Sequence, residues 1–102
     1  MPVVEVEELL YRHPAVQDAA VVAMPDARLG ERGCVFVALR PGASFTFPEL
    51  VRYLQSCQLA KNYFPERLEL IPEMPRTPSG KIQKYKLREL AQTLPEEQAT
   101  AR

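Results

Sequence analysis

Two apolar stretches decide the fold of this chain: DAAVVAM at residues 18–24 and RGCVFVAL at residues 32–39. Small and β-branched apolar residues fill both, which is typical of buried strands. The segment PDARLG at 25–30 contains the residues that turns favour, so the two strands are predicted to form a hairpin. Pro41 and Gly42 then end the second strand.

A short helix is predicted before this hairpin. Val6, Leu9 and Leu10 fall on one helical face. The helix is expected to stop at His13, because the residue before a proline, here Pro14, disfavours the helical region.

A second helix is predicted after the hairpin. Thr46 and Glu49 have the spacing of a capping box, and Pro48 falls in the first turn, where its missing N–H costs little. The apolar stripe that follows consists of Leu50, Val51, Leu54 and Cys57.

The rest of the chain supplies one more strand and one more helix. A third strand is predicted at 67–71, followed by a proline-rich loop at 72–80. The last helix begins near Ile82 or Gln83. Its apolar side is predicted to consist of Leu87, Leu90, Ala91 and Leu94.

The element order is therefore α-β-β-α-β-α. It favours a small two-layer α+β domain, in which a sheet of about three strands, largely antiparallel, is covered by helices. We expect the domain to span 1–94, with a polar, frayed tail at 95–102. A chain of 102 residues, of which 46% are hydrophobic and 25% charged, has a single-domain length and an ordered composition.

Composition excludes several classes of protein. No apolar run approaches the roughly 20 residues of a membrane-spanning helix. Glu5, Glu7 and Glu8 stand where a signal peptide has basic and apolar residues. Cys34 and Cys57 lie in apolar patterns without the spacing of zinc ligands, which is typical of reduced cysteines. We therefore expect a cytoplasmic protein without a metal site.

Positive charge is concentrated in one segment although the formal net charge is zero. The basic residues are Arg76, Lys81, Lys84, Lys86 and Arg88, with no acidic residue before Glu89. This basic segment indicates either a solvated helix face or a site for a ligand that carries phosphate. A neutral domain fits a small anion better than a long nucleic acid.

The loop PRTPSGKIQK at 75–84 presents Lys81 just before the last helix. Two prolines stiffen it, and Gly80 permits a backbone conformation that other residues avoid. Because such turns are also common in purely structural loops, the loop alone leaves both roles open. A P-loop is excluded, since Pro75 replaces the required glycine and Ile82 the required serine or threonine.

The same ten residues resemble the C-terminal signature of the adenylate-forming superfamily, which contains acyl-CoA synthetases, peptide-synthetase adenylation domains and luciferases. Similar blocks follow the family's order: EVEELLYRHPAV at 5–16, MPDARLGE at 24–31 and VFV at 35–37. The resemblance covers residues 5–92, and IQKYKLR at 82–88 is most similar to fatty or carbocyclic acyl-CoA synthetases.

This resemblance implies a catalytic lid. In the family, a large N-terminal adenylation domain holds ATP, Mg²⁺ and a carboxylic acid, and the small domain supplies a lysine for acyl-AMP formation and part of the CoA-binding face. The resemblance assigns that lysine to Lys81. Local hydrogen bonds of Thr77 and Ser79 and the backbone freedom of Gly80 are expected to support its loop. Arg28 lies in the turn where some relatives place a CoA contact, and the alternative is a solvated loop arginine. By itself the chain is then expected to be monomeric and inactive, with no tightly bound cofactor.

Two alternatives remain: a small nucleic-acid-binding module and a free-standing adaptor domain. A nucleic-acid-binding sheet stacks bases on aromatic side chains. Here only Phe36 is a plausible strand aromatic. An adaptor would lack an adenylation domain upstream.

Overall fold

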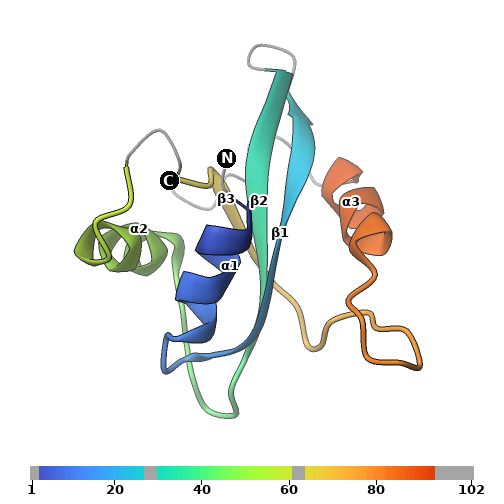
Figure 1. The fold of residues 1–102 in the computed structure, drawn as a ribbon, viewed down its shortest axis with the longest axis horizontal. Helices are drawn as coiled ribbons and strands as arrows, with labels where there is room; N and C mark the ends of the chain where they lie inside the picture. The colour runs from blue at the N-terminus through green and yellow to red at the C-terminus, as the bar shows by residue number, and fades with distance from the viewer. Residues whose placement is uncertain (1–2, 27–29, 61–63, 94–102) are drawn as a thin grey trace.

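The computed structural model describes residues 3–26, 30–60 and 64–93 (Figure 1). In chain order the elements are α1 (Val3–Tyr11), β1 (Val16–Asp26), β2 (Gly30–Leu39), α2 (Phe47–Ser56), β3 (Arg67–Leu70) and α3 (Lys84–Gln92). The predicted α+β class and element order are confirmed. The predicted tail at 95–102 lies outside the described residues.

The three strands form one mixed sheet in the order β1-β2-β3. β1 and β2 are the predicted antiparallel hairpin, paired from Val16 opposite Leu39 to Asp26 opposite Gly30. β3 joins β2 in parallel. A parallel neighbour requires a crossover, and α2 lies on the connection that carries the chain from β2 back to β3.

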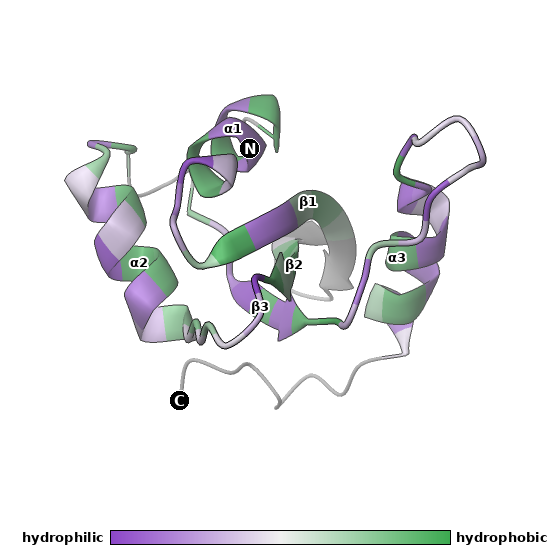
Figure 2. Cartoon of the chain, turned by 90° about the horizontal axis from the view of Figure 1, so that it is seen from below, coloured by the Kyte–Doolittle hydropathy of each residue, from purple (hydrophilic) through white to green (hydrophobic). Residues whose placement is uncertain are grey.

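Both faces of the β1–β2 hairpin are buried at residues 19–22 and 34–37, which explains why these segments are continuously apolar. On one face lie Ala19, Val21, Val35 and Val37, and on the other Ala20, Val22, Cys34 and Phe36. α1 and α2 cover the first face, whereas α3 lies across the sheet from them (Figure 2). The expected two layers are therefore completed by a third, smaller layer that α3 forms.

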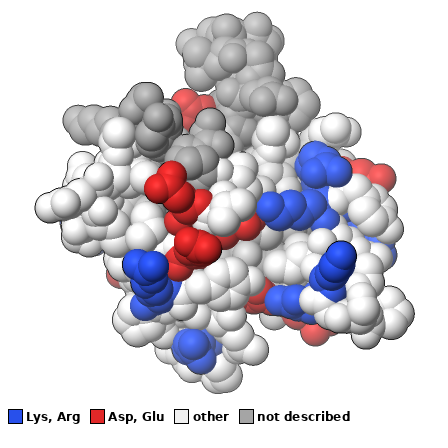
Figure 3. All heavy atoms as spheres, in the orientation of Figure 1, with Lys and Arg blue, Asp and Glu red and all other residues white. Residues whose placement is uncertain are grey.

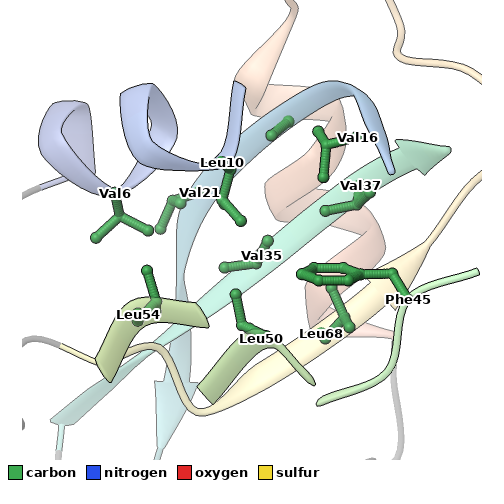
Figure 4. Packing of buried hydrophobic residues seen from close by; sticks show 11 residues of the cluster. Val6, Leu10, Val16, Val21, Val35, Val37, Phe45, Leu50, Leu54 and Leu68 are labelled. Carbon is green, nitrogen blue, oxygen red and sulfur yellow. The ribbon is translucent and has the colours of Figure 1, made fainter. Parts of the chain in front are cut away.

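The larger core lies between the sheet and the first two helices. α1 contributes Val6 and Leu10, and α2 contributes Leu50 and Leu54; all four are fully buried (Figure 4). The predicted capping box starts α2: the backbone N–H of Thr46 donates to Glu49 Oε1 at 2.8 Å, and the N–H of Glu49 donates to Thr46 Oγ1 at 3.3 Å. This cap fixes where the buried stripe begins.

The second core is narrower. Leu87 and Ala91 of α3 are buried against Ala20 and Phe36. Leu90, predicted to be on the same apolar side, is instead 46% exposed, and Leu94 lies outside the described residues. A lone helix on a small sheet buries one narrow stripe, here residues four apart, so Leu90 falls beside the contact.

No helix among the described residues is both long and apolar enough to cross a membrane.

Replacing Leu54 by alanine tests the larger core. Because Leu54 is fully buried, Leu54→Ala should lower the free energy of unfolding by about 2–5 kcal/mol. Leu90→Ala removes the same atoms from an exposed position, so it should change that free energy by less than about 0.5 kcal/mol. Urea unfolding of the 102-residue chain measures both. Equal losses would show that the helix faces are assigned wrongly.

Candidate functional site

Residues 75–83 form a small hairpin before α3, and we call this segment the lysine hairpin. At its base, Arg76 and Ile82 form an antiparallel bridge, and the N–H of Gln83 donates to the carbonyl of Pro75 at 2.8 Å. Ile82 also packs against the smaller core. The base is therefore fixed to the domain, whereas the tip projects away from the sheet (Figure 1).

The tip is a three-residue loop between Thr77 and Lys81. The N–H of Gly80 donates to the carbonyl of Thr77, and the N–H of Thr77 donates to the carbonyl of Lys81, both at 2.8 Å. Gly80 has φ of +97°, in the region that favours glycine, as the third residue of such loops commonly does. A Cβ at Gly80 would meet no atom within 4 Å, so the constraint is torsional rather than steric.

The hydroxyl groups of two side chains in this loop form hydrogen bonds within it. Thr77 Oγ1 accepts a hydrogen bond from the N–H of Lys81 at 3.1 Å. The same oxygen lies 2.9 Å from Ser79 Oγ, within hydrogen-bonding distance. Thr77 and Ser79 therefore order the turn next to Lys81, which is a local role of the kind that these side chains commonly have.

Lys81 itself is exposed. Within the described part of the chain, its ammonium group makes no ion pair or hydrogen bond. Because the charge of Lys81 is unpaired among these residues and its hairpin is fixed at the base, the ammonium group can approach an anion on another molecule or domain without first breaking an internal ion pair or hydrogen bond.

Arg76 ties the lysine hairpin to β1. Its guanidinium donates to Asp18 Oδ2 and to the carbonyl oxygen of Gly80. The other oxygen of Asp18 accepts from the hydroxyl of Tyr11 in α1. Burial, and secondarily the hydrogen bond to Asp18, raises the pKa of Tyr11. The hydrogen bond to Asp18 also raises the pKa of Arg76, so the guanidinium stays charged.

A second tie lies at the other end of the lysine hairpin. Lys84 Nζ lies 2.6 Å from Glu7 Oε2. The same oxygen accepts from the backbone N–H of Val21, on the free edge of β1, at 2.8 Å. Lys84 therefore links α3 to α1 and to the sheet edge.

The basic segment thus has two kinds of members. Arg76 and Lys84 are paired with carboxylates, whereas Lys81, Lys86 and Arg88 make no ion pair with another described residue. Basic side chains gather over α3 and the lysine hairpin, and acidic ones over α1 (Figure 3). Charge alone did not separate these two groups, because their carboxylate partners are distant in sequence.

Two positions outside the basic segment remain. Arg28, assigned a CoA contact, lies outside the described residues. His13 packs its ring 4.6 Å from that of Phe45 and 4.7 Å from that of Tyr53, measured between centroids. Its Nδ1 accepts from the N–H of Ala15 at 3.0 Å, a local hydrogen bond in the turn between α1 and β1.

No group of three or more His, Cys, Asp or Glu side chains in the described residues could hold a metal ion.

Known proteins are similar to this chain in both sequence and fold. Residues 5–81 match the family of the AMP-binding enzyme C-terminal domain. The chain is 48% identical over 85 residues to a medium-chain fatty-acid–CoA ligase of Escherichia coli, covering 82% of this chain and 15% of that protein. It is 53% identical over 85 residues to pyochelin synthase PchD of Pseudomonas aeruginosa, covering 83% of this chain and 15% of that protein.

Solved structures agree. An acyl-CoA synthetase of Brucella canis is 40% identical with a TM-score of 0.77, over 86% of this chain and 17% of that one. ATP-bound MatB of Rhodopseudomonas palustris is 30% identical with a TM-score of 0.83, over 89% of this chain and 18% of that one.

The chain thus spans about 15% of the length of the curated relatives it matches. The matched region takes in the sheet, the first two helices and the lysine hairpin as far as Lys81. This chain belongs to the family of AMP-binding enzyme C-terminal domains.

Proposed function

We propose that this chain is the mobile C-terminal lid of an ATP-dependent acyl-CoA synthetase, and that Lys81 stabilises the charge that builds up while acyl-AMP forms. One observation carries the proposal: Lys81 is exposed, and its charge is unpaired among the described residues. The hairpin that holds it is fixed at its base and ordered at its tip. The relatives that are ligases of fatty acids and CoA support the choice of reaction.

The proposed reaction needs a positive charge at this place. In the first half-reaction a carboxylate attacks the α-phosphorus of ATP, so two anions must approach each other. An ammonium group is a compact charge with three donors on a flexible stem, and it can contact a carboxylate oxygen and a phosphate oxygen together. Positioned beforehand, such a charge lowers the barrier without reorganisation during the reaction.

The rest of the proposed site lies on a large N-terminal adenylation domain of the same polypeptide. That domain would bind ATP, Mg²⁺ and the carboxylic acid, and no step is assigned to Mg²⁺ on this chain. In the second half-reaction CoA displaces AMP, and another face of this lid, including Arg28, would contribute to CoA binding. Closure of the lid in two orientations would assemble each site when it is needed.

The structure weakens the nucleic-acid alternative. Phe36, the strand aromatic on which base stacking would depend, is 2% exposed and lies beneath α3. A base cannot stack on a side chain that the domain's own helix covers.

Lys81→Ala, in the full-length enzyme that carries this domain, tests the proposal. Adenylation, measured as acid-dependent release of pyrophosphate, should fall by about two orders of magnitude or more. Thioester formation from synthetic acyl-AMP and CoA should be largely retained, because the lysine acts only in the first step. Lys86→Ala removes an equivalent exposed charge and should leave both rates unchanged. Equal loss in both half-reactions of Lys81→Ala would rule out the assigned role.

The 102-residue chain alone should make no acyl-CoA. The proposed nucleotide and acid sites belong to the large domain, so Lys81 of a monomeric lid would have no bound ATP or carboxylic acid to contact. Incubation with ATP, Mg²⁺, CoA and a medium-chain fatty acid, followed by detection of the thioester, measures this. Turnover by the purified chain would contradict the division of the site between two domains.

Gly80→Ala tests whether the conformation of the hairpin matters for adenylation. Gly80 has φ of +97° and Gly42 has φ of +78°, and both have open space where a Cβ would lie. Alanine should therefore cost about 1 kcal/mol of stability at either position. Only Gly80→Ala should slow pyrophosphate release, by about tenfold, because only Gly80 shapes the loop next to Lys81. Equal adenylation rates in the two variants would show that the shape of the loop is irrelevant.

A further inference from the structure

Asp18 lies on the side of β1 that faces the lysine hairpin, next to an irregularity in the strand. The pairing of β1 with β2 shifts register between Val16 and Asp18, as in a β-bulge. Val16 therefore joins the larger core together with Ala19, three residues later. Asp18 is two residues before Ala20, which lies in the smaller core on the side of α3. Regular alternation from Ala20 therefore directs the carboxylate toward the side on which the lysine hairpin lies, and the bulge changes the face of the preceding residue, Val16.

Arg76 is the residue that uses this carboxylate. Its guanidinium joins Asp18, 58 positions earlier in the chain, to the carbonyl oxygen of Gly80, four positions later. Asp18 is itself held by Tyr11 and is 14% exposed, so it is a fixed point rather than a mobile surface group. The planar guanidinium can donate in two directions at once, which an ammonium group on a lysine cannot do with the same geometry.

The carbonyl that Arg76 holds belongs to the peptide group that joins Gly80 to Lys81. The other polar end of this peptide group, the N–H of Lys81, donates to Thr77 Oγ1. Side chains therefore hold both ends of the one peptide plane that sets the direction of Lys81. Without these contacts the plane could rotate, because glycine restricts its backbone less than any other residue.

We propose that Arg76 is a positioning residue for Lys81: anchored to β1 through Asp18, it fixes the Gly80–Lys81 peptide plane and so directs the lysine side chain. This inference rests on the proposed function of Lys81 in adenylation. It gives Arg76 no contact with substrate, since its charge is already paired with Asp18.

The decisive experiment compares Arg76→Gln with Arg88→Gln in the full-length enzyme. Both remove one positive charge from the basic segment, but Arg88 is exposed on α3 and is not part of the lysine hairpin. Arg76→Gln should lower kcat of adenylation by about tenfold with little change in KM for ATP. It should leave thioester formation from synthetic acyl-AMP unchanged. Arg88→Gln should stay within about twofold of the unmodified enzyme in both steps.

Combined variants separate positioning from direct binding. If Arg76 acts through Lys81, adding Arg76→Gln to Lys81→Ala should cause no further loss of adenylation. Asp18→Asn removes the negative charge and one of the two acceptor oxygens that hold Arg76 and Tyr11, so it should reproduce at least part of the loss seen in Arg76→Gln. Arg76→Lys keeps the charge but not the two-directional donor, so it should remain close to Arg76→Gln.

Several results would overturn the inference. One is a further loss of adenylation when Arg76→Gln is added to Lys81→Ala. Another is a normal adenylation rate in Arg76→Gln, in Asp18→Asn or in Arg76→Lys. The last is an equal loss of adenylation and thioester formation in Arg76→Gln. The Lys81→Ala variant distinguishes failure of this inference from failure of the proposed function. If Lys81→Ala loses adenylation while Arg76→Gln does not, only the positioning role of Arg76 is wrong. If Lys81→Ala retains adenylation, both the proposed function and this inference are wrong.

Discussion

Burial of the β1–β2 hairpin on both faces is the constraint on which the rest of this domain depends. A hairpin whose two faces are apolar must be covered twice. α1 and α2 do so on one face, and only α3 remains for the other. The chain must therefore pass from β3 on the sheet to α3 on the outer face, and the segment that makes this passage contains the lysine hairpin. Met74 and Ile82 near its two ends pack against the smaller core.

The polar contacts at the free edge of β1 decide how this hairpin is oriented. An edge strand leaves N–H groups without a strand partner, and Glu7 accepts one of these from Val21. Asp18 lies on the same strand and receives Tyr11 and Arg76. Because these ion pairs are partly exposed, each adds little to stability. Their effect is geometric: they join α1, the sheet edge and both ends of the lysine hairpin.

This arrangement suits the proposed role of Lys81, in which its ammonium group would act at the surface of another domain. The base of the lysine hairpin is fixed, its tip is ordered by its own hydroxyl groups, and the ammonium group of Lys81 makes no hydrogen bond or ion pair among the described residues. Ordering the backbone in advance leaves little to be immobilised when the two domains meet, and this lowers the cost of assembling a site between them.

The sequence by itself determined the features that depend on neighbouring residues. The element order, the capping box of α2, the helix stop before Pro14 and the special backbone at Gly80 follow from local sterics and local hydrogen bonds. Tertiary structure alone decided the parallel addition of β3, the third layer formed by α3 and the exposure of Leu90. It also decided which basic residues are paired, because Arg76 meets Asp18 from 58 positions away and Lys84 meets Glu7 from the far end of the chain. Such pairs leave no periodic pattern in the sequence, since they arise only when packing brings distant segments to the same sheet edge.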